Sequence, residues 1–198
     1  MQDALPSLLA TRKGHFRLES GHHSDLWLDL ELLCLHPERV QRLAVELSQR
    51  LSGHSVEVVC GPLVEGAFVA LLVASAMEVE FVYAERFAAA QNHALFAVRY
   101  RLPDALRARV RGKRVAIVND VINAGSAVRG TFADLIECGA QPVAIGALLV
   151  LGTSASSFAA DKKVALESLA QQPNVLWRPE ECPLCLSGVP LDNPHAFT

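Results

Sequence analysis

The stretch from Asn119 to Ala127 holds the side chains best suited to chemistry in this sequence. It follows the apolar run Val115–Val118 and opens with two polar residues, Asn119 and Asp120. The Asp120 carboxylate can accept hydrogen bonds from the vicinal hydroxyls of a ribose, and the Asn119 amide can accept or donate them. A carboxylate beside a bound phosphate also favours Mg²⁺, a hard cation that prefers oxygen ligands. The pattern therefore indicates a site for sugar hydroxyls with Asp120 as a metal ligand.

A turn of small residues follows and leads into a predicted helix over Gly125–Cys138. The start of a helix offers unpaired backbone N–H groups and a positive dipole end, which together hold a phosphate. Ala124 and Gly125 leave room for close approach, and Ser126 adds a hydroxyl donor. We therefore expect a phosphate at the amides of Ala124 to Ala127. The alternative is an ordinary strand–turn–helix with an Asn-Asp turn. The loop has the glycine pattern of neither a P-loop nor a dinucleotide-binding turn.

Strand-like and helix-like segments alternate along the chain. Short, apolar, valine-rich runs predict buried strands at Val56–Cys60, Glu80–Tyr83, Val115–Val118 and Val143–Leu151. Helical patterns cover Pro37–Leu51, Gly66–Met77 and Gly125–Cys138. This alternation predicts an α/β fold with a central, mainly parallel sheet flanked by helices. Such sheets bind ligands beyond the carboxyl ends of their strands, which is where the stretch after Val118 would lie.

Size and composition limit the classes of protein that fit. The chain has 198 residues, of which 51% are hydrophobic, so we expect a single domain with a hood over 1–36 and a tail over 178–198. The net charge of −3 argues against a general nucleic-acid binder. No apolar run reaches the roughly 20 residues of a membrane span. Met1–Lys13 lacks the pattern of a signal peptide, so we expect a cytoplasmic protein.

The Asn119–Ala127 stretch resembles the signature with which type I phosphoribosyltransferases bind phosphoribosyl pyrophosphate (PRPP). That signature has four apolar residues, two acidic ones, two apolar ones and a small Thr/Ala/Gly/Ser run. The wider resemblance is to orotate phosphoribosyltransferases and covers nearly the whole chain. It includes a hood segment at Gly14–Asp25 and a pyrophosphate loop at Gly61–Gly66. It also includes the strand before a flexible lid, at Val82–Arg86, and the tail of some bacterial members, at Trp177–Pro190.

The resemblance implies transfer of phosphoribosyl from PRPP–Mg²⁺ to a nitrogenous base by a homodimer with shared lids. It implies a PRPP site made of Asn119, Asp120, Val121, Asn123, Ala124, Gly125, Ser126, Ala127 and Arg86. Asp120 and Asn119 would be the catalytic pair, acting through positioning and electrostatic stabilisation. The implied pyrophosphate loop contains Gly61, Pro62, Glu65 and Gly66.

Two departures from the family pattern concern PRPP itself. Asn119 stands where the family has the first of two carboxylates, which lowers the negative charge available to a developing positive charge. Glu65 replaces a glycine of the pyrophosphate loop, where a carboxylate repels pyrophosphate unless it turns away or binds Mg²⁺. These changes favour an alternative function, a PRPP- or nucleotide-binding regulator without transferase activity.

Other departures concern the base and the lid. Asn123 stands in place of the loop threonine and is our candidate for contacting the base. The strand residues Gly146–Gly152 offer no arginine for the carboxylate of orotate. The lid Phe87–Ala97 has no lysine and no glycine, and His93 is its only titratable residue. Arg86, Arg99 and Arg101 are therefore the better phosphate candidates.

Cys182-Pro-Leu-Cys185 has the spacing of half a zinc site. Cys34 and His36 could complete four ligands if the fold brings them close, and the alternatives are a structural turn or a labile thiol pair. In the hood, we expect His15, His22, His23 and Asp25 to be surface or hydrogen-bonding residues, with metal binding by His22 and His23 as the alternative.

Overall fold

The computed structural model describes residues 9–87 and 95–194. The strands are β1 (Thr11–Arg17), β2 (His23–Leu28), β3 (Val58–Pro62), β4 (Glu80–Phe87), β5 (Arg99–Arg101), β6 (Arg114–Ile122), β7 (Gln141–Leu151) and β8 (Ala165–Gln172). The α-helices are α1 (Pro37–Leu51), α2 (Glu65–Met77), α3 (Asp104–Arg107), α4 (Ser126–Glu137), α5 (Ser154–Lys162) and α6 (Pro183–Leu186). Short 3₁₀ turns are η2 (Leu30–Leu35), η3 (Ser52–His54) and η4 (Pro179–Glu181).

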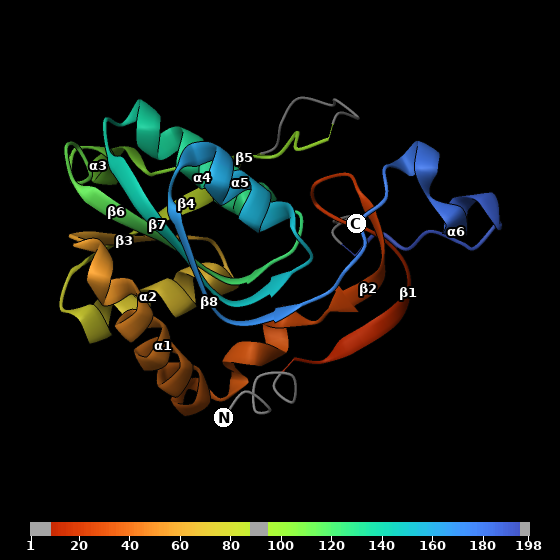
Figure 1. The fold of residues 1–198 in the computed structure, drawn as a ribbon, viewed down its shortest axis with the longest axis horizontal. Coiled ribbons are helices and arrows are strands. Elements are labelled where there is room, and N and C mark those ends of the chain that lie inside the picture. The colour runs from red at the N-terminus through yellow and green to blue at the C-terminus, as the bar shows by residue number, and fades with distance from the viewer. Residues whose placement is uncertain (1–8, 88–94, 195–198) are drawn as a thin grey trace.

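A six-stranded sheet with the order β5-β4-β3-β6-β7-β8 forms the centre of the molecule (Figure 1). Its strands run parallel except β5, which pairs antiparallel with β4. Helices α1 and α2 cover one face, and α4 and α5 cover the other (Figure 1). The predicted α/β fold with a mainly parallel sheet is therefore confirmed.

The predicted elements agree with the structure best where the apolar pattern is strong. Helix α1 begins and ends at the predicted residues, Pro37 and Leu51, because its apolar stripe is unbroken and Pro37 suits a first turn. The predicted end of β6 at Val118 was wrong. The strand continues to Ile122 and pairs Asn119 with Ala147 of β7. Polar residues are tolerated at this end of a central strand because they face a cavity, described below.

Several elements were not predicted. Strands β1 and β2 form a separate two-stranded antiparallel sheet in the hood, and β5, β8 and α5 extend the main layers. The tail returns to the hood through isolated bridges that pair Phe16 with Asp192 and, just ahead of the tail, His23 with Trp177. Within the described ranges, 9–87 and 95–194, we find no helix with the length and apolar character that crossing a bilayer requires.

Helix α2 packs unusually close to β3, and Gly61 makes this possible. A Cβ atom at Gly61 would lie 2.5 Å from Ala70 Cβ and 2.7 Å from Ala67 Cα. Real side-chain contacts are not that short, so only glycine fits between the strand and the helix. This close contact fixes where α2 begins relative to the carboxyl end of β3.

Candidate functional site

A cavity of about 750 Å³ lies at the carboxyl ends of β3, β4 and β6, where the crevice of a parallel sheet is expected. Every residue from Asn119 to Ala127 lines it. The opposite wall comes from the hood and includes Leu26, Trp27 and Leu28. The volume falls within the range of pockets that hold small organic ligands.

The turn between β6 and α4 presents the start of a helix to this cavity. Gly125 precedes α4 with φ of +86°, a conformation that favours glycine. No side chain caps the helix, so the N–H groups of its first turn, from Ser126 on, are available to an anion. The Ser154 hydroxyl donates to the Ala124 carbonyl oxygen at 2.8 Å and holds the turn in place. The arrangement has the form of a phosphate site.

Asp120 is a buried carboxyl group on the cavity wall, with 3% of its surface exposed. Burial raises its pKa from 3.8 to about 7, and the nearby Glu65 carboxylate adds to the rise. Backbone N–H groups of Val121 and Asp120 oppose the shift. A carboxyl group that titrates near neutrality can release its proton when a cation or positively charged group binds beside it.

Asn119 lies on β6, and its side chain is held against the start of α2. Its side-chain amide donates to the Val121 carbonyl oxygen at 2.9 Å. Its Oδ1 faces Gly66 so closely that a Cβ atom on Gly66 would lie 2.0 Å away. The contact joins the two segments predicted to bind PRPP, Asn119–Ala127 and Gly61–Gly66.

The residues assigned to the pyrophosphate loop lie in three settings. Pro62 ends β3, while Glu65 and Gly66 begin α2, and all three line the cavity. Gly61 is not among the lining residues and instead packs beneath α2. The turn itself is therefore only Leu63 and Val64, which also line the cavity.

Arg86 lies on the cavity wall in an ion pair with Glu19 of the hood, with its Nε 3.1 Å from Glu19 Oε1. The Tyr100 hydroxyl donates to the same Glu19 oxygen at 2.9 Å. Burial and the Glu19 carboxylate raise the pKa of Tyr100, so its hydroxyl stays protonated. Glu19 and Tyr100 were not predicted as site residues, although Glu19 lies in the hood segment Gly14–Asp25.

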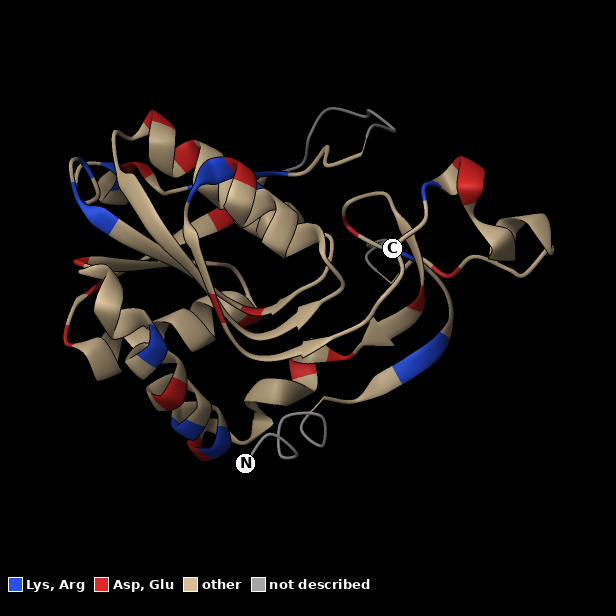
Figure 2. Ribbon diagram, in the orientation of Figure 1, with Lys and Arg blue, Asp and Glu red and all other residues tan. Residues whose placement is uncertain are grey.

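The other predicted arginines lie elsewhere. Figure 2 shows Lys and Arg residues scattered over several elements among Asp and Glu residues. Arg99 and Arg101 are exposed on β5, and Arg101 pairs with Asp104 at 3.0 Å. Neither is among the cavity-lining residues, so Arg86 is the arginine that the described part of the chain brings to the cavity. His93 lies outside the described residues.

Asn123 lines the cavity near the end of the sheet. Its Oδ1 accepts a hydrogen bond from Asn174 Nδ2 at 2.9 Å, which fixes the orientation of the amide. Asn174 follows β8 and was not predicted as a supporting residue, because nothing in its local sequence marks it. With its oxygen engaged in this bond, the Asn123 side chain offers its amide N–H groups as donors.

Comparison with known proteins agrees with this geometry. A sequence profile described as "Phosphoribosyl transferase domain" matches residues 35–180. A protein of Pelotomaculum thermopropionicum named orotate phosphoribosyltransferase is 33% identical over 185 residues, covering 93% of this chain and 90% of its own. A protein of the same name from Thermotoga maritima is 30% identical over 194 residues, covering 98% of this chain and 96% of its own.

Solved structures share the fold at lower identity. Adenine phosphoribosyltransferase from Thermoanaerobacter pseudethanolicus matches with a TM-score of 0.67 at 15% identity, over 87% of this chain and 100% of that one. Orotate phosphoribosyltransferase from Aeropyrum pernix matches with a TM-score of 0.63 at 21% identity, over 86% and 92%. The profile and the curated relatives cover most of the sequence, and the chain therefore belongs to the phosphoribosyltransferase family.

Proposed function

We propose that the protein transfers the phosphoribosyl group of PRPP to a nitrogenous base. The observation that carries this proposal is that one cavity is lined by the open start of α4, the buried Asp120 carboxyl group and Arg86. These three groups suit the 5-phosphate, the ribose and the pyrophosphate of one PRPP molecule. The relatives named orotate phosphoribosyltransferase support the same reaction.

The proposed reaction replaces pyrophosphate at the anomeric carbon of the ribose by a nitrogen of the base. Asp120, with Asn119 beside it, holds the ribose hydroxyls and places a negative charge near the carbon that becomes positive in the transition state. The first turn of α4 and the Ser126 hydroxyl hold the 5-phosphate. Arg86 and the start of α2 face the departing pyrophosphate. Catalysis then depends on positioning and charge, without a covalent nucleophile.

Mg²⁺ is the cofactor that we propose. The Asp120 and Glu65 carboxyl groups both line the cavity, and the Glu65 carboxylate contributes to the raised pKa of Asp120. A hard divalent cation that prefers oxygen ligands would relieve this repulsion, so the donor set fits. When bound, Mg²⁺ would neutralise charge on the pyrophosphate, and Asp120 would hold it on the protein side.

The base is proposed from Asn123 and from apolar residues that line the same cavity. The hood residues Leu26, Trp27 and Leu28 form an apolar wall that suits a flat ring. The Asn123 amide suits a carbonyl oxygen of the ring. A pyrimidine fits this pair of features, and orotate is the first base to test because the relatives carry its name. We further propose a cytoplasmic homodimer, in which the hood, the sheet and the tail form a single domain.

The test measures PRPP binding and pyrophosphate release separately. Calorimetry with PRPP, with and without Mg²⁺, reports binding, and a coupled assay reports pyrophosphate release with orotate, uracil, cytosine, adenine and hypoxanthine. We expect Mg²⁺-dependent binding and turnover with one pyrimidine. Tight binding without turnover for any base would make the protein a PRPP-binding regulator. Absence of PRPP binding would rule out both functions.

A further inference from the structure

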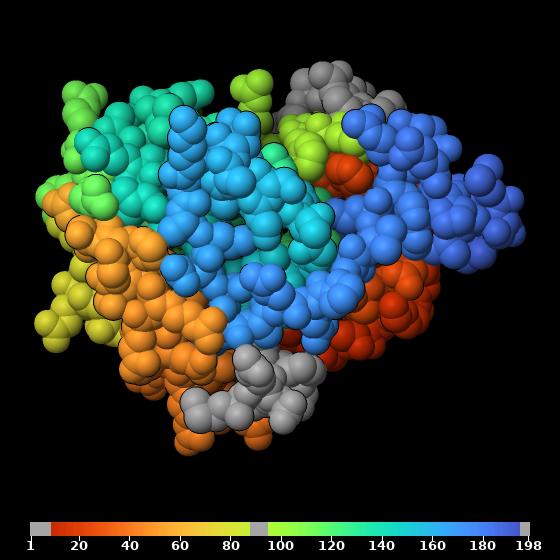
Figure 3. All heavy atoms as spheres, viewed as in Figure 1, coloured from red at the N-terminus to blue at the C-terminus, as the bar shows by residue number. Residues whose placement is uncertain are grey.

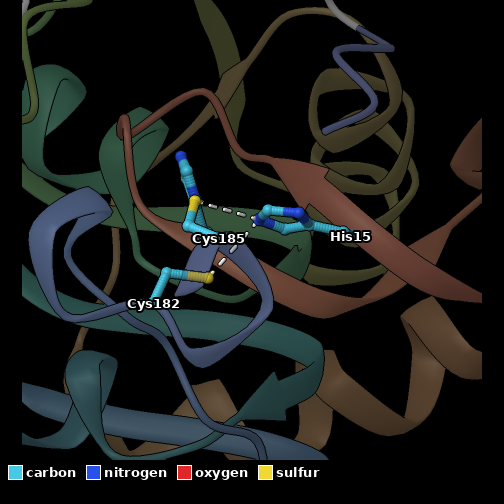
Figure 4. A group of neighbouring side chains, drawn as sticks. His15, Cys182 and Cys185 are labelled. Carbon is cyan, nitrogen blue, oxygen red and sulfur yellow. Dashed lines mark hydrogen bonds between the residues drawn. The ribbon is translucent and has the colours of Figure 1, made fainter. Parts of the chain in front are cut away.

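We propose that His15, His23, Cys182 and Cys185 bind one Zn²⁺ ion that joins the hood to the C-terminal tail. Their four ligand atoms all lie within 4.8 Å of one another. His15 lies on β1 and His23 on β2. Cys182 directly precedes α6, and Cys185 lies within it. Figure 4 shows His15 directed toward the Cys182 and Cys185 sulfur atoms. Cys34 and His36 do not take part in this cluster, so the partners suggested by the sequence were wrong.

The distances between ligand atoms fit a tetrahedral zinc ion. His15 Nε2 lies 3.4 Å from Cys182 Sγ and 3.7 Å from Cys185 Sγ. His23 Nδ1 lies 3.3 Å from Cys185 Sγ and 3.1 Å from His15 Nε2. A tetrahedral ion with bonds of about 2.0–2.3 Å keeps its ligand atoms about 3.3–3.8 Å apart. Four of the six separations between ligand atoms therefore lie within or close to this range, and all six are at most 4.8 Å.

The protonation of His15 favours a metal over a hydrogen-bonded network. His15 Nδ1 lies 2.8 Å from the Val189 carbonyl oxygen. A carbonyl can only accept, so Nδ1 carries the proton and Nε2 turns a lone pair toward the cluster. Metal-bound histidines commonly hold their second nitrogen in this way. One lone pair can accept a single strong hydrogen bond, yet three ligand atoms converge on it. A zinc ion satisfies all four groups at once.

Backbone hydrogen bonds bring the hood and the end of the chain together around the cluster. The backbone carbonyl oxygen of Asp192, in the tail, accepts a hydrogen bond from the Arg17 N–H at 2.8 Å. The backbone carbonyl oxygen of Trp177 accepts one from the His23 N–H at 2.8 Å. Both strands of the hood are therefore tied to the end of the chain. His15, His23 and Cys182 are buried while Cys185 is exposed, which leaves a path for an ion to enter.

A site with four protein ligands has no open position, so its role is structural. The segment between the two histidine ligands contains Leu18, Glu19 and Ser20, which line the cavity. Zinc would fix both ends of this segment and hold the hood in place. The metal site does not depend on the proposed reaction, and its test needs no measurement of activity.

The first experiment measures the zinc content of the full-length protein after expression in zinc-supplemented medium and purification under reducing conditions. We expect about one zinc per chain, and less than about a tenth of that in Cys182→Ser and in Cys185→Ser. Cys34→Ser is the matched control because Cys34 is a free cysteine outside the cluster, and it should keep the metal. Metal-free wild-type protein that does not take up zinc would overturn the proposal, as would full retention in both cysteine variants.

A second experiment uses the wild-type chain alone, in case the variants do not fold. Co²⁺ in a tetrahedral site with two thiolates gives intense visible bands and a near-ultraviolet charge-transfer band. We expect both in the cobalt-loaded protein. We also expect zinc to protect the exposed Cys185, but not Cys34, from alkylation read by mass spectrometry. A weak octahedral cobalt spectrum, or equal alkylation with and without zinc, would overturn the site.

Discussion

The two walls of the cavity are built in different ways. The sheet wall consists of strand ends and helix starts that follow one another closely, as in the run from Asn119 to Ala127, and the backbone holds it. The hood wall is held by contacts between residues far apart in the chain, through side chains and through backbone bridges to the end of the chain. Glu19 pairs with Arg86, and the tail lies against the hood, as Figure 3 shows in blue beside red. The sheet wall is suited to fixing reacting atoms, and the hood wall to closing over a substrate.

If the sheet wall fixes the reacting atoms, the largest effect on activity is expected at Asp120. Replacing it by Asn keeps the shape and removes the charge that we place near the anomeric carbon. We expect kcat to fall by about 10²–10³-fold, the loss typical of removing one electrostatic contact to a transition state. Steady-state pyrophosphate release measures it. Asp104→Asn is the control, since Asp104 is exposed on α3, and it should change kcat by less than about twofold.

A loss of less than about fivefold at Asp120 would contradict the assignment of chemistry to the sheet wall. Circular dichroism should show that the variant is folded. PRPP binding by calorimetry should weaken less than turnover does, because the phosphate contacts at the start of α4 remain.

The rigidity of the sheet wall is tested at Gly61. Gly61→Ala places a methyl group 2.7 Å from the Ala67 Cα atom, so α2 has to move as a unit. Such overpacking costs about 1–3 kcal/mol. Urea unfolding measures the loss, and PRPP binding should weaken with it because Gly66 moves away from Asn119. Gly53→Ala is the matched control, since nothing lies within 4 Å of a Cβ atom there. Equal stability of the two variants would contradict the close packing.

The raised pKa of Asp120 also predicts that ionisation of this carboxyl group lowers the stability of the protein at high pH. Its pKa is about 7 in the folded chain and 3.8 when exposed, so the folded state binds the extra proton between these values. Stability from this group is therefore greatest at low pH and falls as pH rises through that window. Asp120→Asn removes the buried charge and should stabilise the protein by roughly 1–2 kcal/mol at about pH 8.

The gain in the free energy of unfolding of Asp120→Asn should shrink toward about pH 4 and level off above about pH 7. Thermal unfolding across this range in buffer without divalent cations measures it. Glu137→Gln, at an exposed carboxyl group on α4, is the control. A gain that is the same at every pH would contradict the raised pKa of Asp120.

The local parts of this architecture could be predicted from the sequence. Helix α1 and the PRPP-type stretch depend on residues close together in the chain, so their pattern contains the information. The end of β6 was misplaced at Val118 because Asn119 and Asp120 are polar, as in a loop. Their burial on a strand became visible only with the cavity that they line.

The contacts of the hood could not be predicted in this way. Glu19 meets Tyr100 across 81 residues of sequence, and His15 meets Cys182 across 167. No local pattern specifies such pairs, which is why Cys34 and His36, rather than His15 and His23, were chosen as partners for the tail cysteines. Arg86 was predicted to face pyrophosphate, but its ion pair with Glu19 was not foreseen for the same reason.

The smallest predicted effect concerns Glu19, which ties the hood wall to the sheet wall. Glu19→Gln removes the ion pair to Arg86, a partly exposed pair worth about 1 kcal/mol or less. Because the hood supplies the apolar wall for the base, we expect the KM for the base to rise about two- to fivefold. The KM for PRPP should not rise, since the freed Arg86 remains able to contact phosphate, and kcat should stay within about twofold.

Asp25→Asn is the control for Glu19. Asp25 is another hood carboxylate, paired with Lys13 at 3.0 Å, and it is not among the cavity-lining residues. It should leave both KM values unchanged. A fall in kcat of more than about tenfold in Glu19→Gln would place Glu19 among the groups that act on the reacting atoms. The hood wall would then take part in the chemistry, and our assignment of the chemistry to the sheet wall alone would be wrong.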